Sequence, residues 1–272
     1  MPLLLLLLLC GTAAFAQDTT MARSFKLYSA ILNEERSFTA YIPATSKGRL
    51  EVVYVLDGQA QFTNVVNALK QLGQNEKIVI GIGNIWLRDR DYTPTHVNAS
   101  PFLDSKAAAV SGGGEKFISH LEKELIPYVN SHCPAGTSSI LIGHSLGGLI
   151  AIDILLNHSN LFGKYVIIDP SMWWDNKRFV KQAMERLENV TRQTLLFLAM
   201  ANTGKKDKND IEAMRKDTTQ TTALSRPTLL LLDYLNTHPN NHIKLDWKYY
   251  RDCDHMSVFQ PAVNDGLKFL FK

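Results

Sequence analysis

Five consecutive residues, Gly143-His144-Ser145-Leu146-Gly147, form a G-x-S-x-G pattern that can present a serine hydroxyl as a nucleophile. The pattern follows the apolar run 140–142 and leads into a predicted helix, residues 146–156, which has a broad apolar face. Glycines allow a sharp turn from strand to helix, and such a turn pushes the hydroxyl outward. An inert serine in a tight turn is the alternative, but the strand–turn–helix context favours a nucleophile.

A serine hydroxyl is a weak nucleophile until a base takes its proton. His255 is the candidate base because it lies downstream of Ser145, after the last predicted strand and before the last predicted helix. A surface-loop histidine is the alternative reading of His255. The competing histidines lie beside a polar turn, at a helix end or inside the serine motif: His132, His144, His238 and His242.

A carboxylate should orient the imidazole, and it is expected after the predicted strand at 195–200. Residues 201–204 carry no carboxylate, and the acids come only later, at Asp207, Asp210, Glu212 and Asp217. We favour Asp217 because it directly precedes a Thr-rich segment that begins the next helical stretch. The earlier acids belong to a charged stretch typical of a solvated loop. Asp252, Asp254 or a Ser/His dyad without any acid stay open.

The negative charge that develops on the substrate oxygen needs two backbone N–H donors. One donor is the residue after the nucleophile, Leu146, and the other comes from the loop after an earlier strand. Gln59 is the predicted second donor because Gly58 permits the close turn that would present its N–H group. Leu146 and Gln59 are therefore the predicted oxyanion hole.

Short continuous apolar runs alternate with helical patterns along most of the chain, as expected of strands that are buried on both faces. The runs are 52–56, 78–82, 139–142, 165–168 and 195–198. Helices are expected around 117–129, 146–156 and 227–236 and from Val263, with a last strand at 243–250. Segments 24–32 and 37–42 predict an antiparallel hairpin. The fold class is therefore α/β, with a mainly parallel sheet and helices on both faces. Together with the strand–turn–helix motif at 143–147, this favours an α/β-hydrolase fold.

The composition fits an ordinary globular enzyme: 272 residues, 45% hydrophobic, 20% charged and a formal net charge of +3. Basic and acidic residues are mixed along the chain, so nothing indicates nucleic-acid binding. Neither H-E-x-x-H nor any other metal-ligand spacing occurs, and we expect no metal and no cofactor. The absence of a linker or repeat predicts one domain over residues 17–272, whose oligomeric state the sequence leaves open.

The first sixteen residues are expected to be a signal peptide, because an apolar run from Leu3 to Leu9 leads to an A-x-A site that ends at Ala16. Cleavage there implies a secreted or periplasmic protein. A lipid anchor on Cys10 is the second choice, since Leu9 is larger than the residue expected before such a cysteine. No segment is apolar enough to span a bilayer. The cysteines left after cleavage, Cys133 and Cys253, could form one disulfide.

With these residues placed, the chain resembles the putative-esterase family, which includes siderophore esterases, S-formylglutathione hydrolases, feruloyl and acetyl esterases and mycolyltransferases. The resemblance covers nearly all of residues 17–272. It rests on the segments Tyr54-Val55-Leu56-Asp57-Gly58, Gly143 to Gly147, Asp254-His255-Met256-Ser257-Val258 and 265–271. It implies the roles given above to Ser145, His255, Gln59 and Leu146. The acid position departs from the family's commoner Gly-x-x-Glu pattern.

The segment Arg88 to Pro94 and the pair Trp173-Trp174 resemble the siderophore-esterase branch of that family. The resemblance implies that the substrate cleft is bordered by Arg88, Tyr92, His144, Trp173 and Trp174. The charges at 88–91 could instead form a self-compensated surface cluster, and the tryptophans could serve only in packing.

Three hypotheses follow from the sequence. The first is an ester hydrolase that forms an acyl-enzyme on Ser145 and acts on a siderophore lactone, a carbohydrate ester or another small ester. The second is an acyltransferase with the same residues. The third is a non-catalytic binding domain, against which the intact Ser145 and His255 argue.

Overall fold

Eight strands form one sheet, in the order β1-β2-β4-β3-β5-β6-β7-β8. The computed structural model describes residues 22–44, 48–84, 86–203 and 210–272. The strands are β1 (Arg23–Ser29), β2 (Glu34–Tyr41), β3 (Leu50–Val55), β4 (Ile78–Ile82), β5 (Ala135–His144), β6 (Lys164–Ile168), β7 (Thr194–Ala201) and β8 (Ile243–Tyr250). Neighbours from β4 to β8 pair in parallel, whereas β1 and β2 are antiparallel. The predicted mainly parallel sheet with an antiparallel hairpin is confirmed.

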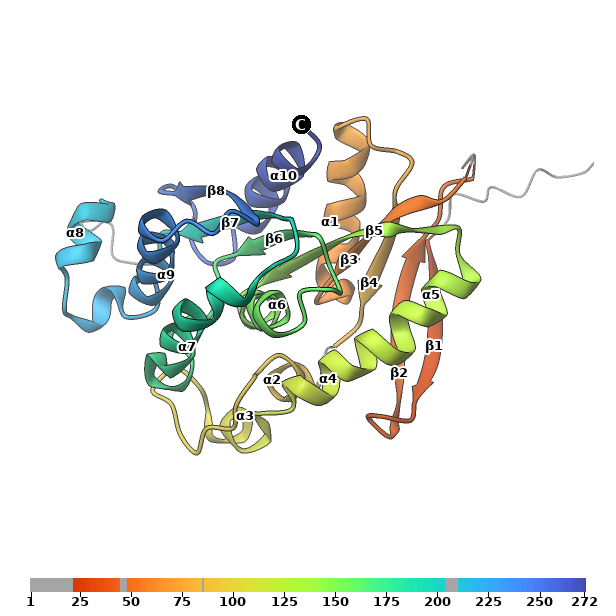
Figure 1. Ribbon diagram of the computed structural model, residues 1–272. Coiled ribbons are helices and arrows are strands. Elements are labelled where there is room, and N and C mark those ends of the chain that lie inside the picture. The colour runs from red at the N-terminus through yellow and green to blue at the C-terminus, as the bar shows by residue number, and fades with distance from the viewer. Residues whose placement is uncertain (1–21, 45–47, 85, 204–209) are drawn as a thin grey trace, which may run out of the picture.

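Helices cover both faces of the sheet (Figure 1). The longer ones are α1 (Gly58–Gln71), α6 (Leu146–Asn157), α7 (Arg178–Arg186), α9 (Arg226–Thr237) and α10 (Phe259–Leu270). One face carries α1 and α10, and the other carries α6 with α7 and α9 beside it. The central strands β3, β4 and β6 are almost wholly buried because both of their faces are covered. Residues at the carboxyl ends of these strands are thus held by two packed layers.

The edge strands differ from the central ones. The burial of β8 alternates along its length, which shows that one of its faces meets solvent. At the other edge, β1 and β2 form the predicted hairpin, with Arg23 opposite Ala40 and Ser29 opposite Glu34. The hairpin joins the parallel strands through antiparallel pairing of β2 with β4.

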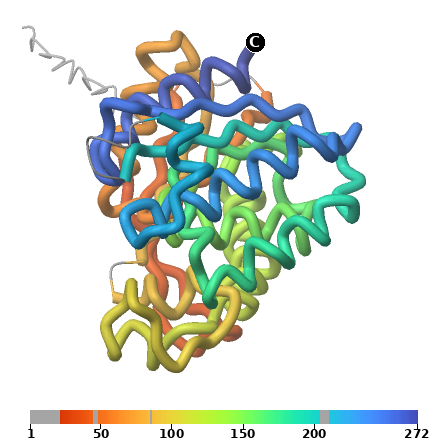
Figure 2. Tube along the Cα trace, turned by 90° about the vertical axis from the view of Figure 1, so that its left-hand side faces the viewer, coloured from red at the N-terminus to blue at the C-terminus, as the bar shows by residue number. Residues whose placement is uncertain are grey.

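The shorter helices lie mainly in the connections. They are α2 (Arg88–Asp91), α3 (Ser105–Val110), α4 (Gly114–His120), the π-helical turn η1 (Leu121–Leu125), α5 (Ile126–His132) and α8 (Ile211–Lys216). Single 3₁₀ turns are η2 (Asp175–Lys177), η3 (Leu187–Asn189) and η5 (Gln220–Thr222). In Figure 2 the yellow segment that contains α2 and α3 lies at the far end of the molecule from the C-terminus.

Two of the long helices, α1 and α7, were not predicted. In α1 the apolar positions Phe62, Val65, Val66 and Leu69 do follow helical spacing and are all buried. Polar residues and β-branched side chains separate them, which weakens the pattern within a short window. The structure therefore adds a helix directly after Asp57, and this helix positions the predicted oxyanion donor.

Candidate active site

Ser145 stands at a strained strand-to-helix turn between β5 and α6. Its backbone has φ 60° and ψ −121°, in a region that residues other than glycine rarely adopt. Gly143 permits the turn, because a Cβ atom on it would come within 2.3 Å of the Gly147 carbonyl oxygen. The predicted strand–turn–helix context is therefore present, and it directs the Ser145 hydroxyl out of the sheet.

His255 lies in the turn between β8 and α10, and its imidazole pairs with Asp169. Nδ1 of His255 lies 2.6 Å from Oδ2 of Asp169. Because a carboxylate accepts hydrogen bonds, this contact leaves the proton on Nδ1 and makes Nε2 free to take a proton. The other carboxylate oxygen of Asp169 accepts a hydrogen bond of 3.0 Å from the Ala201 N–H group, at the end of β7.

The prediction that Asp217 orients His255 is wrong in this geometry, since the carboxylate bonded to His255 belongs to Asp169. Asp217 accepts hydrogen bonds from the Thr219 N–H and hydroxyl groups, at 3.0 and 2.9 Å, and from the Thr222 hydroxyl, at 2.8 Å. Arg226 lies 3.7 Å away and partly balances its charge. The physical role of Asp217 is to hold the turn between α8 and α9.

The other candidate acids also have local partners or lie elsewhere. Asp210 accepts from the Glu212 N–H group at the start of α8. Asp254 accepts from the N–H groups of Met256 and Ser257, which lowers the pKa of its carboxyl below the ordinary value. Glu212 pairs with Arg215, Asp252 is exposed, and Asp207 lies outside the described residues.

Asp169 was missed although the sequence signal for it was visible. It follows the apolar run 165–168 directly, at the carboxyl end of a predicted parallel strand, where polar residues of α/β sheets gather. The sequence instead predicts the acid after the next strand, β7. Pairing of β6 with β7 brings Asp169 beside the end of β7, so the carboxylate reaches the same place from the neighbouring strand.

A cavity of about 490 Å³ joins the serine to the histidine. It is lined by Phe102, Ser145, Asp169, Pro170, Ser171, Trp173, Asn202, Thr203, Leu224, Asp254 and His255. The Ser145 hydroxyl lies 3.4 Å from the Ser171 hydroxyl, and the Ser171 N–H group donates to the Ser145 carbonyl oxygen. The Ser145 hydroxyl therefore lies at the cavity wall beside Ser171.

His144 supports the loop of His255 rather than lining the cavity. Its Nε2 atom lies 2.8 Å from the His255 carbonyl oxygen, and the centroids of the two imidazole rings are 4.5 Å apart. Burial, the dominant cause, and the nearby His255 together lower the pKa of His144 to about 3. His144 is thus neutral at ordinary pH, with the proton on Nε2 donated to the carbonyl.

The two predicted oxyanion donors stand at helix N-termini. Leu146 is the first residue of α6 and Gln59 the second residue of α1, so neither N–H group has an acceptor within its helix. Both lie at the positive end of a helix dipole. The side chain of Gln59 accepts a 3.0 Å hydrogen bond from the Asn84 N–H group. A Cβ on Gly58 would lie 2.3 Å from Gly81, so glycine is required where α1 begins.

Of the five residues expected to bind substrate, only Trp173 lines the cavity. It packs edge-on against Phe102, with ring centroids 5.1 Å apart. Trp174 is fully buried and donates from its indole to the Thr95 hydroxyl, so it belongs to the core. Tyr92 is also fully buried, and its hydroxyl accepts from the Asp57 N–H group. Arg88 pairs with Asp57.

Two further expectations concern sulfur and metals. Cys133 and Cys253 are both free thiols, so the possible disulfide is not formed. Within the part of the chain that the structure describes, no group of three or more His, Cys, Asp or Glu side chains could hold a metal ion.

Comparison with known families assigns the chain. The family described as "Putative esterase" matches residues 29–252, well over half of the sequence, and the chain therefore belongs to this family. A solved structure described as an IroE-like serine hydrolase from Shewanella oneidensis has a TM-score of 0.83 and 30% identity, and the match covers 92% of this chain and 80% of that chain. The siderophore hydrolase EstA from Aspergillus nidulans shares the fold, with a TM-score of 0.73, 21% identity and 92% and 93% coverage.

Curated relatives agree with that assignment. The chain is similar to the ferri-bacillibactin esterase BesA of Bacillus subtilis, with 27% identity over 59% of this chain and 62% of the relative. It is also similar to the siderophore triacetylfusarinine C esterase of Aspergillus fumigatus, with 25% identity over 84% of each. The chain spans less than two thirds of BesA and of YbbA, an uncharacterised Bacillus subtilis protein that is 30% identical over 59% of its length. The predicted family and α/β-hydrolase fold are confirmed, and membership of a family described as esterases supports the predicted enzyme class.

Proposed function

We propose that this chain is a serine carboxylic-ester hydrolase that forms an acyl-enzyme on Ser145. His255 takes the serine proton as general base and returns it to the leaving alcohol, after which it activates the water that releases the acid. Asp169 holds the imidazole in the required tautomer. Leu146 and Gln59 donate their N–H groups to the oxyanion of the tetrahedral intermediate.

The single observation that carries this proposal is the 2.6 Å contact between His255 Nδ1 and Asp169 in a cavity shared with Ser145. The buried Asp169 carboxylate orients the His255 imidazole, which is 39% exposed. The Nε2 atom of His255 can then accept the proton of the Ser145 hydroxyl. The strained backbone of Ser145 supports the same role, because such strain persists where the surrounding structure enforces it.

We propose a siderophore ester as the substrate. The names of the Bacillus and Aspergillus relatives support this choice. The cavity walls support a bulky group near the serine, since Phe102, Trp173 and Leu224 offer apolar surface beside the polar Asn202 and Thr203. A carbohydrate ester is the alternative small-molecule partner.

The test is a hydrolysis panel with matched variants. It contains p-nitrophenyl acetate to octanoate, methyl ferulate, acetylated xylan, and siderophore lactones with and without iron. We expect hydrolysis of lactones with the highest kcat/KM, and loss of roughly 10³- to 10⁶-fold in kcat for Ser145→Ala. Ser171→Ala is the control for a neighbouring hydroxyl. Fluorophosphonate should label wild type and Ser171→Ala but not Ser145→Ala, and labelling elsewhere would refute the nucleophile.

We also propose that the protein is exported, with cleavage after Ala16. Residues 1–21, which include Cys10, lie outside the described part of the chain, so this proposal rests on the apolar run and the A-x-A site. Within the residues that the structure describes, no helix has both the length and the apolar character needed to cross a membrane. N-terminal sequencing of exported protein should return Gln17, and a lipid on Cys10 would support the anchor instead.

A further inference from the structure

Arg88 touches two loops that are distant in sequence and adjacent in space. Its Nε atom donates to both carboxylate oxygens of Asp57, at 3.0 and 3.1 Å. Its Nη2 atom donates to the His144 carbonyl oxygen, at 3.2 Å. Asp57 follows β3 and His144 ends β5, and these strands are direct neighbours in the sheet. One guanidinium therefore ties the ends of the two strands together.

The two tied residues stand in the same relation to the predicted oxyanion donors. Asp57 lies two residues before Gln59, and His144 lies two residues before Leu146. A Cβ on Gly147 would lie 3.4 Å from Leu56 and 3.6 Å from the Asp57 carboxylate, so the two loops are in packing contact. Any shift of one loop against the other would change the separation of the donors.

Asp57 needs this partner because its own environment is unfavourable. The residue is 7% exposed and its backbone is left-handed, with φ 53° and ψ 42°. Burial raises the pKa of its carboxyl, and the charge of Arg88 opposes that rise. Removing the arginine would leave a buried carboxylate without its ion-pair partner, and the loop would have to move to reach water.

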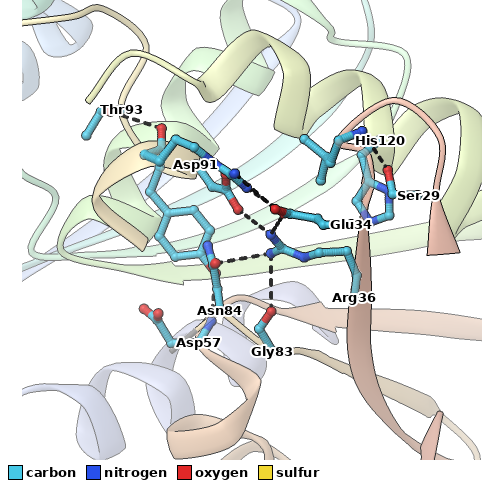
Figure 3. A network of polar contacts seen from close by, with 12 residues as sticks. Ser29, Glu34, Arg36, Asp57, Gly83, Asn84, Asp91, Thr93 and His120 are labelled. Atoms are coloured by element: carbon cyan, nitrogen blue, oxygen red, sulfur yellow. Dashed lines mark hydrogen bonds and ion pairs between the residues drawn. The ribbon is translucent and has the colours of Figure 1, made fainter. Parts of the chain in front are cut away.

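The short helix that carries Arg88 is anchored from the opposite side. Asp91, the last residue of α2, is fully buried and accepts a 2.7 Å hydrogen bond from Arg36 of β2. Figure 3 shows Arg36 also reaching Gly83 and Asn84, and Asn84 in turn donates to Gln59. Tyr92 follows α2, lies under the Arg88 guanidinium and accepts from the Asp57 N–H group. This anchoring keeps Arg88 in place before any substrate arrives.

We propose that Arg88 is a positioning residue that sets the distance between the two halves of the oxyanion hole, rather than a residue that binds substrate. The inference rests on the proposed function of Ser145, because an oxyanion hole has meaning only for an acyl-transfer reaction. It assigns Arg88 an effect on the rate of acylation that does not depend on the charge of the substrate.

Hydrolysis of p-nitrophenyl acetate tests the proposal, because this small neutral ester offers no anionic group that an arginine could bind. We expect Arg88→Gln to lower kcat by about 100-fold with KM changed less than about threefold, as for a small misplacement of catalytic donors. Arg88→Lys keeps the charge but has no planar fork to reach both loops, and it should lose about 10-fold or more. Arg88→Ala should recover part of its kcat when methylguanidinium is added, because the native side chain is 28% exposed.

Arg90→Gln is the matched control, since Arg90 belongs to the same helix and pairs with Glu34 and Asp91. It should change kcat less than about threefold. The double variant Arg88→Gln/Asp57→Asn also removes the buried carboxylate that Arg88→Gln alone leaves without its ion-pair partner. It can therefore be tested even if the Arg88→Gln single variant does not fold. Its kcat should stay low.

The outcomes separate the two proposals. If Ser145→Ala keeps its activity on p-nitrophenyl acetate, the proposed function fails. If Ser145→Ala is inactive while Arg88→Gln keeps normal kcat on that ester and loses only its KM for an anionic substrate, Arg88 binds substrate and the inference is overturned. A loss in Arg88→Ala that methylguanidinium does not restore, equal to the loss in Arg90→Gln, would also overturn it.

Discussion

Two buried aspartates occupy equivalent positions in this protein and have different partners. Asp57 follows β3 with φ 53°, and Asp169 follows β6 with φ 40°. Each is less than a tenth exposed. Asp169 lines the cavity that contains Ser145, and the Asp57 carboxylate lies beside Gly147, two residues after Ser145. Asp57 pairs with Arg88, whereas Asp169 pairs with His255.

The partner decides what each aspartate can do. An arginine keeps its charge at every working pH, so the Asp57 pair can fix geometry but cannot take part in proton transfer. A histidine gains and loses a proton near neutral pH, so the Asp169 pair can serve a reaction in which a proton moves. The same strand-end carboxylate therefore serves structure in one loop and proposed chemistry in the other.

The largest effect is expected from removing the histidine that pairs with Asp169. His255→Ala should lower kcat by roughly 10⁴- to 10⁶-fold, and Ser145→Ala with His255→Ala should be no worse than either single variant, because the two residues act as a unit. His144 cannot replace His255 as the base, since its pKa is lowered to about 3 and its Nε2 atom bonds the His255 carbonyl oxygen. Independent, multiplying losses in the double variant would reassign the base.

The next effect distinguishes Asp169 from the acid that the sequence suggested. Asp169→Asn should lower kcat on the order of 10³- to 10⁴-fold, because an amide no longer enforces the Nδ1–H tautomer. Asp217→Asn should leave kcat within about threefold and lower the unfolding free energy by about 1–3 kcal/mol, since its buried carboxylate accepts hydrogen bonds from Thr219 and Thr222. Steady-state kinetics and denaturant unfolding measure both. Equal kinetic losses would return Asp217 to the mechanism.

A smaller loss is expected at the aspartate paired with arginine. Asp57→Asn keeps a hydrogen-bond acceptor for Arg88 but removes the ion pair, so kcat on p-nitrophenyl acetate should fall by about 10-fold with little change in KM. Asp246→Asn, which changes an exposed carboxylate on β8, is the control. A loss at Asp57 as large as that at Asp169 would erase the distinction between the two pairs.

The smallest effect concerns stability against pH. Burial raises the pKa of Asp57, so the folded state binds its proton more tightly than the unfolded state does. The contribution of Asp57 to stability is therefore greatest below the ordinary aspartate pKa of about 4, and it declines as pH rises through the folded-state pKa. Thermal unfolding of Asp57→Asn and wild type should show the variant gaining relative stability over that pH range. If Asp57→Asn instead lost stability relative to wild type as pH rises from about 4, the sign would be contradicted.

The sequence alone determined the elements whose signals are local. Apolar runs gave the parallel strands, and the alternation in residues 24–42 gave the hairpin, because burial on one face or on both leaves a direct pattern in the residues. The motif 143–147 marked Ser145 for the same reason, since strand, glycine turn and helix follow one another without interruption. His255 was found from its place after the last strand.

Only the tertiary structure decided which carboxylate meets His255 and what Arg88 contacts. Asp169 and His255 are separated by 86 residues, and their contact depends on the lateral order of β6, β7 and β8 in the sheet. Arg88 reaches Asp57 and His144 because β3 and β5 are neighbours despite the long stretch of chain between them. Strand order depends on the packing of the whole core, so no local pattern in the sequence carries it.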